Sequence, residues 1–198
     1  MPLIRLLGKK IGFALPENHA TMGLIFEEIK KLKGEGADLY PLLLHDSGSP
    51  RERMLLEDEL YSLTGKEMVR AAWKDHQKTG ESSAFDLMVI APCPGNMLMK
   101  ILDAAGDPDT MVKALTHLQT DRPIVLALVA NGNCGDLVRH IEQLLALKRI
   151  YLVPFGPTHY QGRQFIITRM DLIMETVVHA FMKEQIQPVI FEHHWLPS

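Results

Sequence analysis

The chain has 198 residues, of which 46% are hydrophobic and 23% charged, and a formal net charge of -3 at pH 7. This length suits one domain, and we expect residues 1–198 to form a single one. The scattered basic residues argue against nucleic acid as the main partner, because nucleic-acid binding usually needs a basic stripe. No apolar run reaches the roughly 18 residues of a membrane span, and no signal peptide opens the chain, so we expect a cytoplasmic protein.

Apolar segments typical of strands alternate with segments of helical periodicity. Segment 85–92, FDLMVIAP, is the clearest strand because it is apolar nearly throughout, as in sheets that helices cover on both faces. Segment 21–34 is the clearest helix, with apolar residues at helical spacing between a Thr21 cap and a Gly34 stop. Pro41 predicts that the second strand begins after it or lies near an edge. Strands are expected at 9–15, 37–46, 85–92, 122–130 and 150–155, and helices at 21–34, 51–64, 97–105, 110–119, 136–147 and 168–184.

Strands that alternate with helices in this way predict a parallel α/β sheet with right-handed crossovers. In such sheets ligands bind beyond the carboxyl ends of the strands, where the strand order reverses. We therefore expect the connections at 14–21, 91–97 and 130–135 to converge on one pocket. The connections at 44–50 and 154–163 are also predicted to follow strands, and residues 66–84 are predicted to include a polar loop.

The first of these connections, ALPENHAT, is not a standard dinucleotide-binding loop. The G-x-G-x-x-G pattern needs several glycines for a close approach of phosphate, and Gly12 stands alone. Asn18 or Thr21 can cap the following helix and present backbone N–H groups to an anion.

The connection at residues 91–97 combines two prolines, a glycine and an asparagine. Pro92 and Pro94 stiffen the backbone and remove two N–H donors, while Gly95 can take dihedral angles closed to other residues. One interpretation is a rigid strand-to-helix turn capped by Asn96. The other is a pre-shaped loop that lays its backbone along a flat ligand, with the Asn96 amide as donor and acceptor.

The segment APCPGNMLMKI resembles the A-P-x-[TS]-x-N-[TS]-x-x-K segment of the flavin-containing cysteine decarboxylase superfamily. Within that superfamily the chain is most similar to the B subunits of dipicolinate synthase. The resemblance extends along nearly the whole chain, and its most specific part is YLVPFG at 151–156 followed by 169–181 and 187–192.

This resemblance implies a doubly wound, Rossmann-like flavoprotein fold with three α/β/α layers. It also implies a subunit of an oxidoreductase that works beside a dehydrogenase-like A subunit. Together the two would oxidise dihydrodipicolinate to dipicolinate in the mother cell of a sporulating bacterium. NADP is expected on the A subunit, and homo-oligomers are expected from the superfamily.

The chain departs from the superfamily pattern where FMN would bind. It has Pro16-Glu17-Asn18 in place of Thr-Gly-Ser, and Pro94 and Met97 in place of hydroxyl residues. Those hydroxyls normally bind the flavin phosphate and ribityl chain, and Glu17 would repel a phosphate. Asn96 and Lys100 still match the superfamily pattern. Because of the departures, FMN binding is expected to be weak.

The candidate catalytic residues are few. None of the nine histidines shows metal-ligand spacing, so no metal site is expected. His45, at the end of the second strand, and His76, in a region from which superfamily decarboxylases take a base, are the candidate general bases. Cys93 has no evident base or cation beside it and is interpreted as a buried small hydrophobe.

The expected ligand pocket combines residues from several connections. By resemblance, Asn131 takes the place of a substrate-contacting asparagine, although Ala130 replaces the usual methionine before it. Arg163 could bind a substrate carboxylate with its guanidinium fork. The expected pocket residues are Asn18, Pro94, Gly95, Asn96 and Asn131, with Arg163 for the dicarboxylate.

Three classes of function remain open on the sequence. The first is the B subunit of a two-component dehydrogenase. The second is an independent FMN-dependent decarboxylase or prenyl-flavin-type enzyme, which the missing hydroxyls disfavour. The third is a scaffold subunit that keeps the fold without a cofactor. The YLVPFG segment favours the first class of function over this third one.

Overall fold

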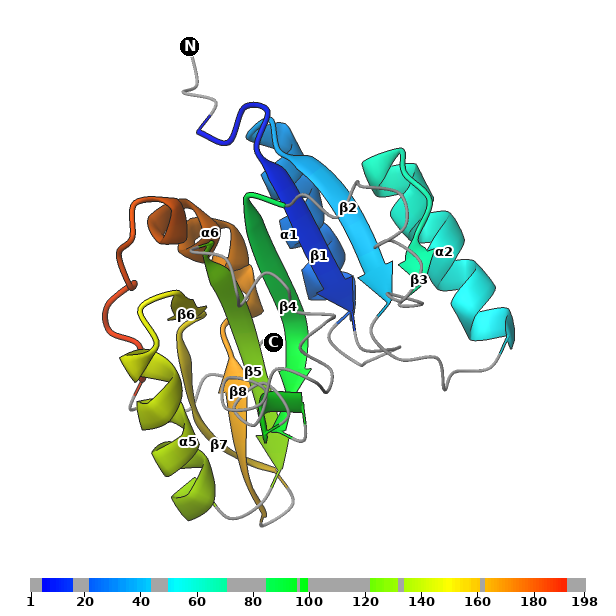
Figure 1. The fold of residues 1–198 in the computed structure, drawn as a ribbon. Coiled ribbons are helices and arrows are strands. Elements are labelled where there is room, and N and C mark those ends of the chain that lie inside the picture. The colour runs from blue at the N-terminus through cyan, green and yellow to red at the C-terminus, as the bar shows by residue number, and fades with distance from the viewer. Residues whose placement is uncertain are drawn as a thin grey trace, which may run out of the picture.

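The computed structural model describes residues 5–15, 22–43, 50–70, 85–95, 97–99, 122–131, 134–160 and 163–191. Its strands form a mixed sheet in the order β3-β2-β1-β4-β5-β8-β7, with β6 paired to β5 beside this path (Figure 1). The strands are β1 (Lys10–Leu15), β2 (Asp38–Leu43), β3 (Val69–Arg70), β4 (Leu87–Pro94), β5 (Ile124–Asn131), β6 (Ile150–Leu152), β7 (Phe155–Tyr160) and β8 (Arg163–Thr168). The helices are α1 (Met22–Gly34), α2 (Pro50–Thr64), α5 (Cys134–Ala146) and α6 (Ile173–Phe181), with a 3-10 turn, η3 (Met170–Leu172), before α6.

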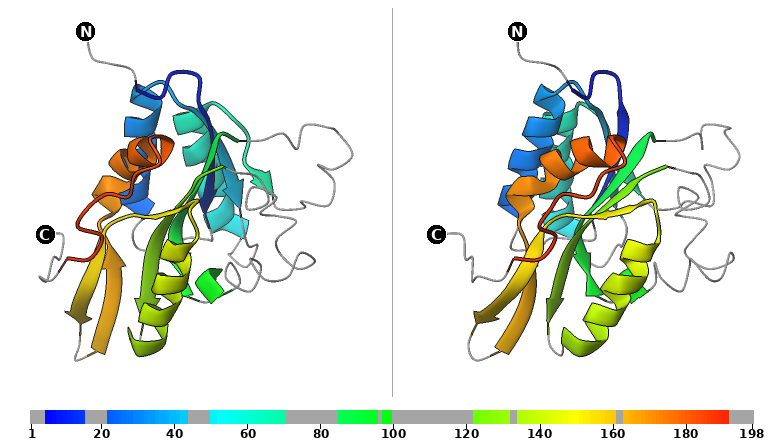
Figure 2. Two further views of the ribbon diagram at one scale, coloured as in Figure 1. Left: turned by 60° about the vertical axis from the view of Figure 1, so that its left-hand side comes forward. Right: turned by 90° about the vertical axis from the view of Figure 1, so that its left-hand side faces the viewer.

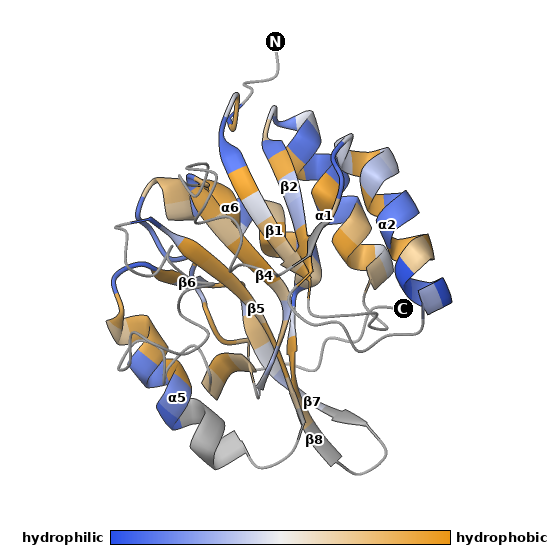
Figure 3. Cartoon of the chain, turned by 45° about the vertical axis from the view of Figure 1, so that its right-hand side comes forward, coloured by the Kyte–Doolittle hydropathy of each residue, from blue (hydrophilic) through white to orange (hydrophobic). Residues whose placement is uncertain are grey.

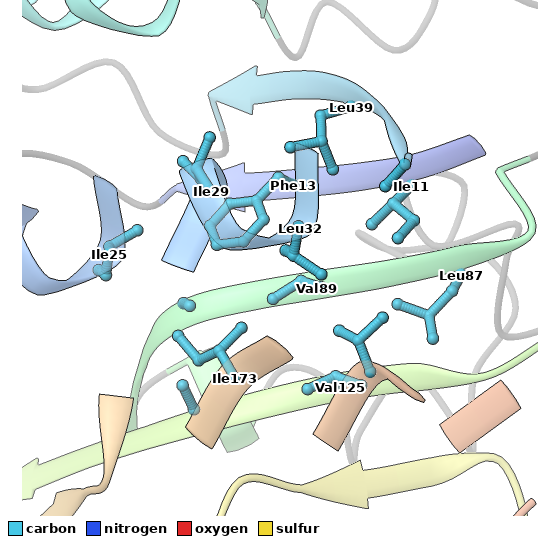
Figure 4. Packing of buried hydrophobic residues seen from close by; sticks show 14 of the residues in the cluster. Ile11, Phe13, Ile25, Ile29, Leu32, Leu39, Leu87, Val89, Val125 and Ile173 are labelled. Atoms are coloured by element: carbon cyan, nitrogen blue, oxygen red, sulfur yellow. The ribbon is translucent and has the colours of Figure 1, made fainter. Parts of the chain in front are cut away.

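Helices cover both faces of the sheet, which confirms the predicted three-layer α/β fold. Alternate strand residues such as Ile11, Phe13 and Val89 pack with side chains of α1 and α6 (Figure 4), in a cluster that α2 also joins. The residues between them, among them Met88 and Ile90, pack on the other face, where α5 lies (Figure 2). Hydrophobic residues therefore dominate the central strands, whereas the helices show hydrophobic and hydrophilic residues side by side (Figure 3).

The second half of the sheet is not wholly parallel, which corrects the expectation of a strand at 150–155 and a loop at 154–163. β6 ends at Leu152, and Pro154 separates it from β7. The break occurs because two strands share one edge of β5. β6 pairs with the first three residues of β5, and β8 pairs in antiparallel orientation with the same edge from Val129 to Asn131. β7 and β8 then form an antiparallel hairpin.

The last helix is also shorter than the 168–184 predicted. Thr168 still belongs to β8, and its hydroxyl donates to the carbonyl of Leu128 at 2.7 Å. The chain then passes through η3 and enters α6 at Ile173. Lys183, in the left-handed region at φ 61°, follows the helix end.

Smaller differences lie around β2. Gly34 is the last residue of α1 rather than its stop, and the left-handed turn uses Gly36 at φ 87°. Pro41 lies inside β2 without costing a hydrogen bond to β1. Asp38 donates its N–H toward β1, to the Lys9 carbonyl at 2.8 Å. Because backbone N–H directions alternate along a strand, the nitrogen of Pro41 is on the opposite edge of β2. There the two residues of β3, which lie before the polar loop predicted within 66–84, pair only with Leu42 and Leu43.

A buried carboxylate joins α1 to α6. Glu28 is 1% exposed on the apolar face of α1, and it accepts hydrogen bonds from the Lys31 ammonium and from the Met174 backbone N–H, the latter at 2.8 Å. Met174 lies in the first turn of α6, where free N–H groups favour a carboxylate. Burial nevertheless raises the pKa of Glu28. The sequence pattern does not predict this contact.

The segment 189–191 covers the outer edge of β7. Phe155 donates its N–H to the Val189 carbonyl at 2.9 Å, and Phe191 donates to the Phe155 carbonyl at 2.8 Å. The close approach requires a glycine at 156, because a Cβ there would lie 2.6 Å from the Phe191 carbonyl oxygen. None of the helices in the described part of the chain is long and apolar enough to cross a membrane.

Gly156→Ala should therefore lower the free energy of unfolding by about 1–3 kcal/mol, as expected when added atoms force backbone apart. Gly23→Ala is the control, because a Cβ at Gly23 in α1 meets nothing within 4 Å. This control should be neutral or stabilising by up to about 1 kcal/mol. Denaturant unfolding of both variants measures the difference, and a Gly156→Ala chain as stable as the parent would contradict the tight packing of 189–191.

Candidate functional site

The carboxyl ends of β1, β4 and β5 lie at one edge of the sheet. The three strands are parallel neighbours, with Ala14 opposite Ile90 and Pro94 opposite Val129. The chain passes from β1 to β2 on one side, and β4 lies on the other side of β1, so the strand order reverses between β1 and β4 (Figure 1). This is the position where open α/β sheets bind ligands.

β4 continues past the point where its pairing with β1 ends. The pairs with β1 stop at Ile90, whereas pairing with β5 resumes at Cys93 and reaches Pro94. From Ala91 to Pro94 the edge of β4 that faces β1 thus has no strand partner among the described residues. The predicted connection 91–97 is in its first half the end of a strand.

A β-bulge accounts for the prolines in this stretch. Ile90 pairs with Leu126 and Cys93 with Leu128, so two β4 residues, Ala91 and Pro92, stand opposite one residue of β5. The peptide bond between them is cis. Bulges and unpaired edges are where a sheet tolerates proline, because no ladder N–H is lost.

The helix after β4 begins at once. A Cβ on Gly95 would lie 3.7 Å from the Cβ of Ala130, so the ends of β4 and β5 are in contact. Met97 and Leu98 are buried in the core on the face of α5. The described part of 91–97 and the first part of 130–135 therefore meet, as predicted. Most of 14–21 lies outside the described residues, so convergence on one pocket stays a prediction.

Two described positions lack the side-chain hydroxyls that the superfamily offers to the phosphate and ribityl chain of FMN. The two positions where the superfamily resemblance implies hydroxyls hold Pro94, which has no N–H, and Met97, whose side chain is 8% exposed in the core. Neither side chain can donate a hydrogen bond to a phosphate. The sequence expectation of weak FMN binding thus gains a structural reason at these two positions.

Cys93 lacks the exposure and the lowered pKa of a reactive thiol. Its side chain is 1% exposed among the apolar residues on the α5 face. Burial raises the pKa of the Cys93 thiol to about 12. The thiol therefore stays protonated, as expected of a small buried hydrophobe.

The β7–β8 hairpin brings two further side chains level with the end of β5. Asn131 pairs with Phe165, and Phe165 pairs with Thr158 of β7. Thr158 is 5% exposed, and its hydroxyl has no hydrogen-bond partner in the described part of the chain. Sequence reasoning missed Thr158, because GPTHY carries no clear strand pattern.

The other predicted residues can be placed only in part. Arg163 was expected in a loop, and its backbone instead begins β8, paired with Tyr160 at the same edge of the sheet. The backbone of Asn131 ends β5. Asn18, His45, His76 and Asn96 lie outside the described residues. Among the side chains that are described, no group of three or more His, Cys, Asp or Glu could hold a metal ion.

Gly12, the lone glycine of the first strand, has a packing role at the opposite end of the sheet. A Cβ at Gly12 would lie 2.6 Å from Cδ2 of Phe85, the residue at which the chain approaches β4. The glycine thus makes room for an aromatic ring and not for a phosphate.

Comparison with known proteins gives consistent results, although no family model matches the chain. The B subunit of dipicolinate synthase from Bacillus subtilis (strain 168) is 30% identical over 194 residues, which cover 96% of each chain. The crystal structure of the B subunit of dipicolinate synthase from Bacillus halodurans aligns with a TM-score of 0.78 at 27% identity, covering 96% of this chain and 99% of that one. A dodecameric FMN-dependent UbiX-like decarboxylase from Escherichia coli O157:H7 shares the fold, with a TM-score of 0.52 at 17% identity over 95% of this chain and 100% of that one.

The burial of Cys93 predicts an inert thiol. In a Cys134→Ser chain, which leaves Cys93 as the one cysteine, a thiol-reactive disulfide reagent at pH 8 should react only after denaturant is added. The absorbance of the released chromophore measures the rate. Labelling of the native chain as fast as that of an unfolded control would contradict the buried placement.

Proposed function

Because the chain belongs to the family of dipicolinate synthase B subunits, we propose that it acts beside a dehydrogenase-like A subunit in the oxidation of dihydrodipicolinate to dipicolinate. The proposed setting is the mother cell of a sporulating bacterium. The observation that carries the proposal is the similarity along 96% of both chains to a protein named as the B subunit of this synthase. That designation implies a partner subunit.

The reaction divides naturally between two subunits. Aromatisation of the dihydropyridine ring removes a hydride and a proton. The hydride goes to the nicotinamide of NADP, which we assign to the A subunit, since this chain lacks a dinucleotide loop. The proton goes to a base, for which His45 and His76 remain the candidates on this chain.

The proposed share of this chain is to bind and orient the flat dicarboxylate at the carboxyl edge of the sheet. Two observations support this location: the edge of β4 at 91–94 has no strand partner among the described residues, and Gly95 contacts Ala130. The described ends of β1, β4 and β5 begin at Ala14, Cys93 and Ala130. Within them, the sole titratable side chain is the Cys93 thiol, which stays protonated. Asn18, Asn96 and Asn131 are the proposed amide contacts, and Arg163 the proposed partner of a substrate carboxylate.

Self-association is the second part of the proposal on partners. The exposed face of α2 carries Met54, Leu55 and Tyr61, each 57–59% exposed. Large apolar side chains gathered on one helix face are typical of contacts between chains. The likeness to a decarboxylase described as dodecameric is in keeping with such assembly.

Co-expression with a dehydrogenase-like partner tests the function directly. An affinity tag on this chain should retain the partner, light scattering should give a mass above one copy of each, and the pair should form dipicolinate with reduction of NADP. The A subunit alone should be much slower. A strict monomer that ignores the partner at micromolar concentrations, or a pair no faster than the A subunit alone, would contradict the proposal.

The purified chain should hold little or no stoichiometric FMN. Pro94 and Met97 offer no side-chain donor where the superfamily has hydroxyls, and each lost hydrogen bond to a charged group weakens binding by roughly 1.5–3 kcal/mol. Absorbance near the flavin band after dialysis measures the content. A yellow preparation with one flavin per chain would show this expectation to be wrong and would favour an FMN-dependent decarboxylase.

Asn96→Asp separates a structural turn from a ligand-binding loop. Aspartate caps a helix about as well as asparagine, so stability should stay within about 1 kcal/mol of the parent. If the loop binds the dicarboxylate, the new negative charge repels it, so dipicolinate formation by the pair should fall at least roughly tenfold, or about 1.4 kcal/mol in transition-state binding. An unfolding curve beside a turnover assay makes the comparison, and unchanged turnover with unchanged stability would reduce the loop to a turn.

A further inference from the structure

Thr158 has a buried hydroxyl whose hydrogen bond is missing in the described part of the chain. Two other buried threonines behave differently. The Thr168 hydroxyl donates to the Leu128 carbonyl and the Thr176 hydroxyl to the Leu172 carbonyl, both at 2.7 Å. Buried polar groups are nearly always paired, so an exception in a folded protein calls for an explanation.

The strand register places Thr158 at the carboxyl edge. β7 runs in the same direction as β5, because each is antiparallel to β8. Thr158 is opposite Phe165, which is opposite Asn131, the last residue of β5. Thr158 is thus level with the end of β5, two strands away from it.

Thr158 also lies on a defined face of the sheet. Two residues before it, Gly156 is opposite Ile167, which is opposite Val129. Val129 packs against the core on the face that α1 and α6 cover. Since side chains alternate along a strand, Thr158 and Phe165 lie on this same face.

A hydroxyl is not needed here for packing, because valine has nearly the same shape without a polar group. Proteins keep such local inconsistencies mainly where function uses them. A threonine hydroxyl can donate to a carboxylate, and the neighbouring ring of Phe165 offers an apolar surface to a flat molecule. We infer that the Thr158 hydroxyl binds a carboxylate oxygen of the aromatic dicarboxylate, an inference that rests on the proposed function for the identity of the ligand.

The first arm of the test needs no ligand. Thr158→Val should raise the melting temperature of the chain by about 2–4 °C, because it removes an unpaired buried hydroxyl. Thr168→Val is the matched control: it makes the same exchange in a buried strand position whose hydroxyl is bonded, and it should lower the melting temperature. A fall for Thr158→Val as well would show that its hydroxyl is paired within the protein and would overturn the inference.

The second arm uses dipicolinate as the probe, with the chain alone and in the pair with the A subunit. Dipicolinate should stabilise the parent, and Thr158→Val should weaken its binding about tenfold, measured by calorimetry. Thr158→Ser, which keeps the hydroxyl, should restore most of the affinity. Equal binding by parent and Thr158→Val would overturn the inference. A Thr158-dependent response to FMN alone, with none to dipicolinate, would overturn the assignment to the dicarboxylate.

Turnover by the pair separates the two proposals. If Thr158→Val raises KM for dihydrodipicolinate with little change in kcat, the hydroxyl acts in binding, as inferred. A pair that turns over with unchanged KM in Thr158→Val would contradict this inference alone. A pair that binds dipicolinate through Thr158 without forming it would contradict the proposed function alone.

Discussion

The end of the β1–β4 pairing at Ile90, followed by a bulge in β4, is the constraint on which the rest of the site depends. If both strands ended at the same level, the backbone beyond Ile90 would be a connection with no fixed direction. Instead, pairing with β5 continues on one side of β4 as far as Pro94. The extra residue of the bulge also exchanges the two faces: Met88 and Ile90 face α5, and Cys93, three residues after Ile90, faces α5 again. Pro94 is therefore directed to the opposite face.

The sheet beyond β5 supports the other half of the site. β5 shares one edge between β6 and β8, and this division sets how far the hairpin extends. The side chain of Gln185 pairs with the backbone of Leu152 in β6. Its amide oxygen accepts the Leu152 N–H at 2.8 Å, and its amide nitrogen donates to the Leu152 carbonyl at 2.7 Å. The outer edge of β7 is closed by 189–191. The pairing of β8 with β5 and with β7 then places Thr158 and Phe165 level with the end of β5.

Local patterns predicted the elements whose burial follows a regular period. The strands at 85–92 and 122–130 could be predicted because they are apolar nearly throughout, and the helix at 21–34 because its apolar residues repeat at helical spacing. The hairpin could not be predicted in this way, since GPTHY becomes a strand only through its pairing with β8. Glu28 shows the same limit: a carboxylate on an apolar helix face is explained by Met174, a residue 146 positions away.

The site divides along the same line. The unusual backbone at Pro94 and Gly95 could be predicted from the residue types, although the sequence does not distinguish a loop from the bulged end of a strand. Their role in a pocket stays a prediction. The contact of Gly95 with Ala130 and the position of Thr158 depend on strand register, which no local pattern carries. An unpaired hydroxyl is visible only once its surroundings are folded. The departures at Pro94 and Met97 were evident in the sequence, and the fold adds that Met97 is a core residue.

Hydrogen exchange of the reconstituted pair, with and without saturating dipicolinate, tests the central claim most directly. If this chain binds the dicarboxylate at the carboxyl edge, dipicolinate should slow amide exchange at the ends of β4 and β5 and in the β7–β8 hairpin. Exchange in the last turns of α1 and α2, which meet at the opposite edge of the sheet where Lys33 donates to the Leu63 carbonyl, should not change with the ligand. Protection confined to the A subunit, with no change at 91–95, 128–131 or 155–168 of this chain, would contradict the account.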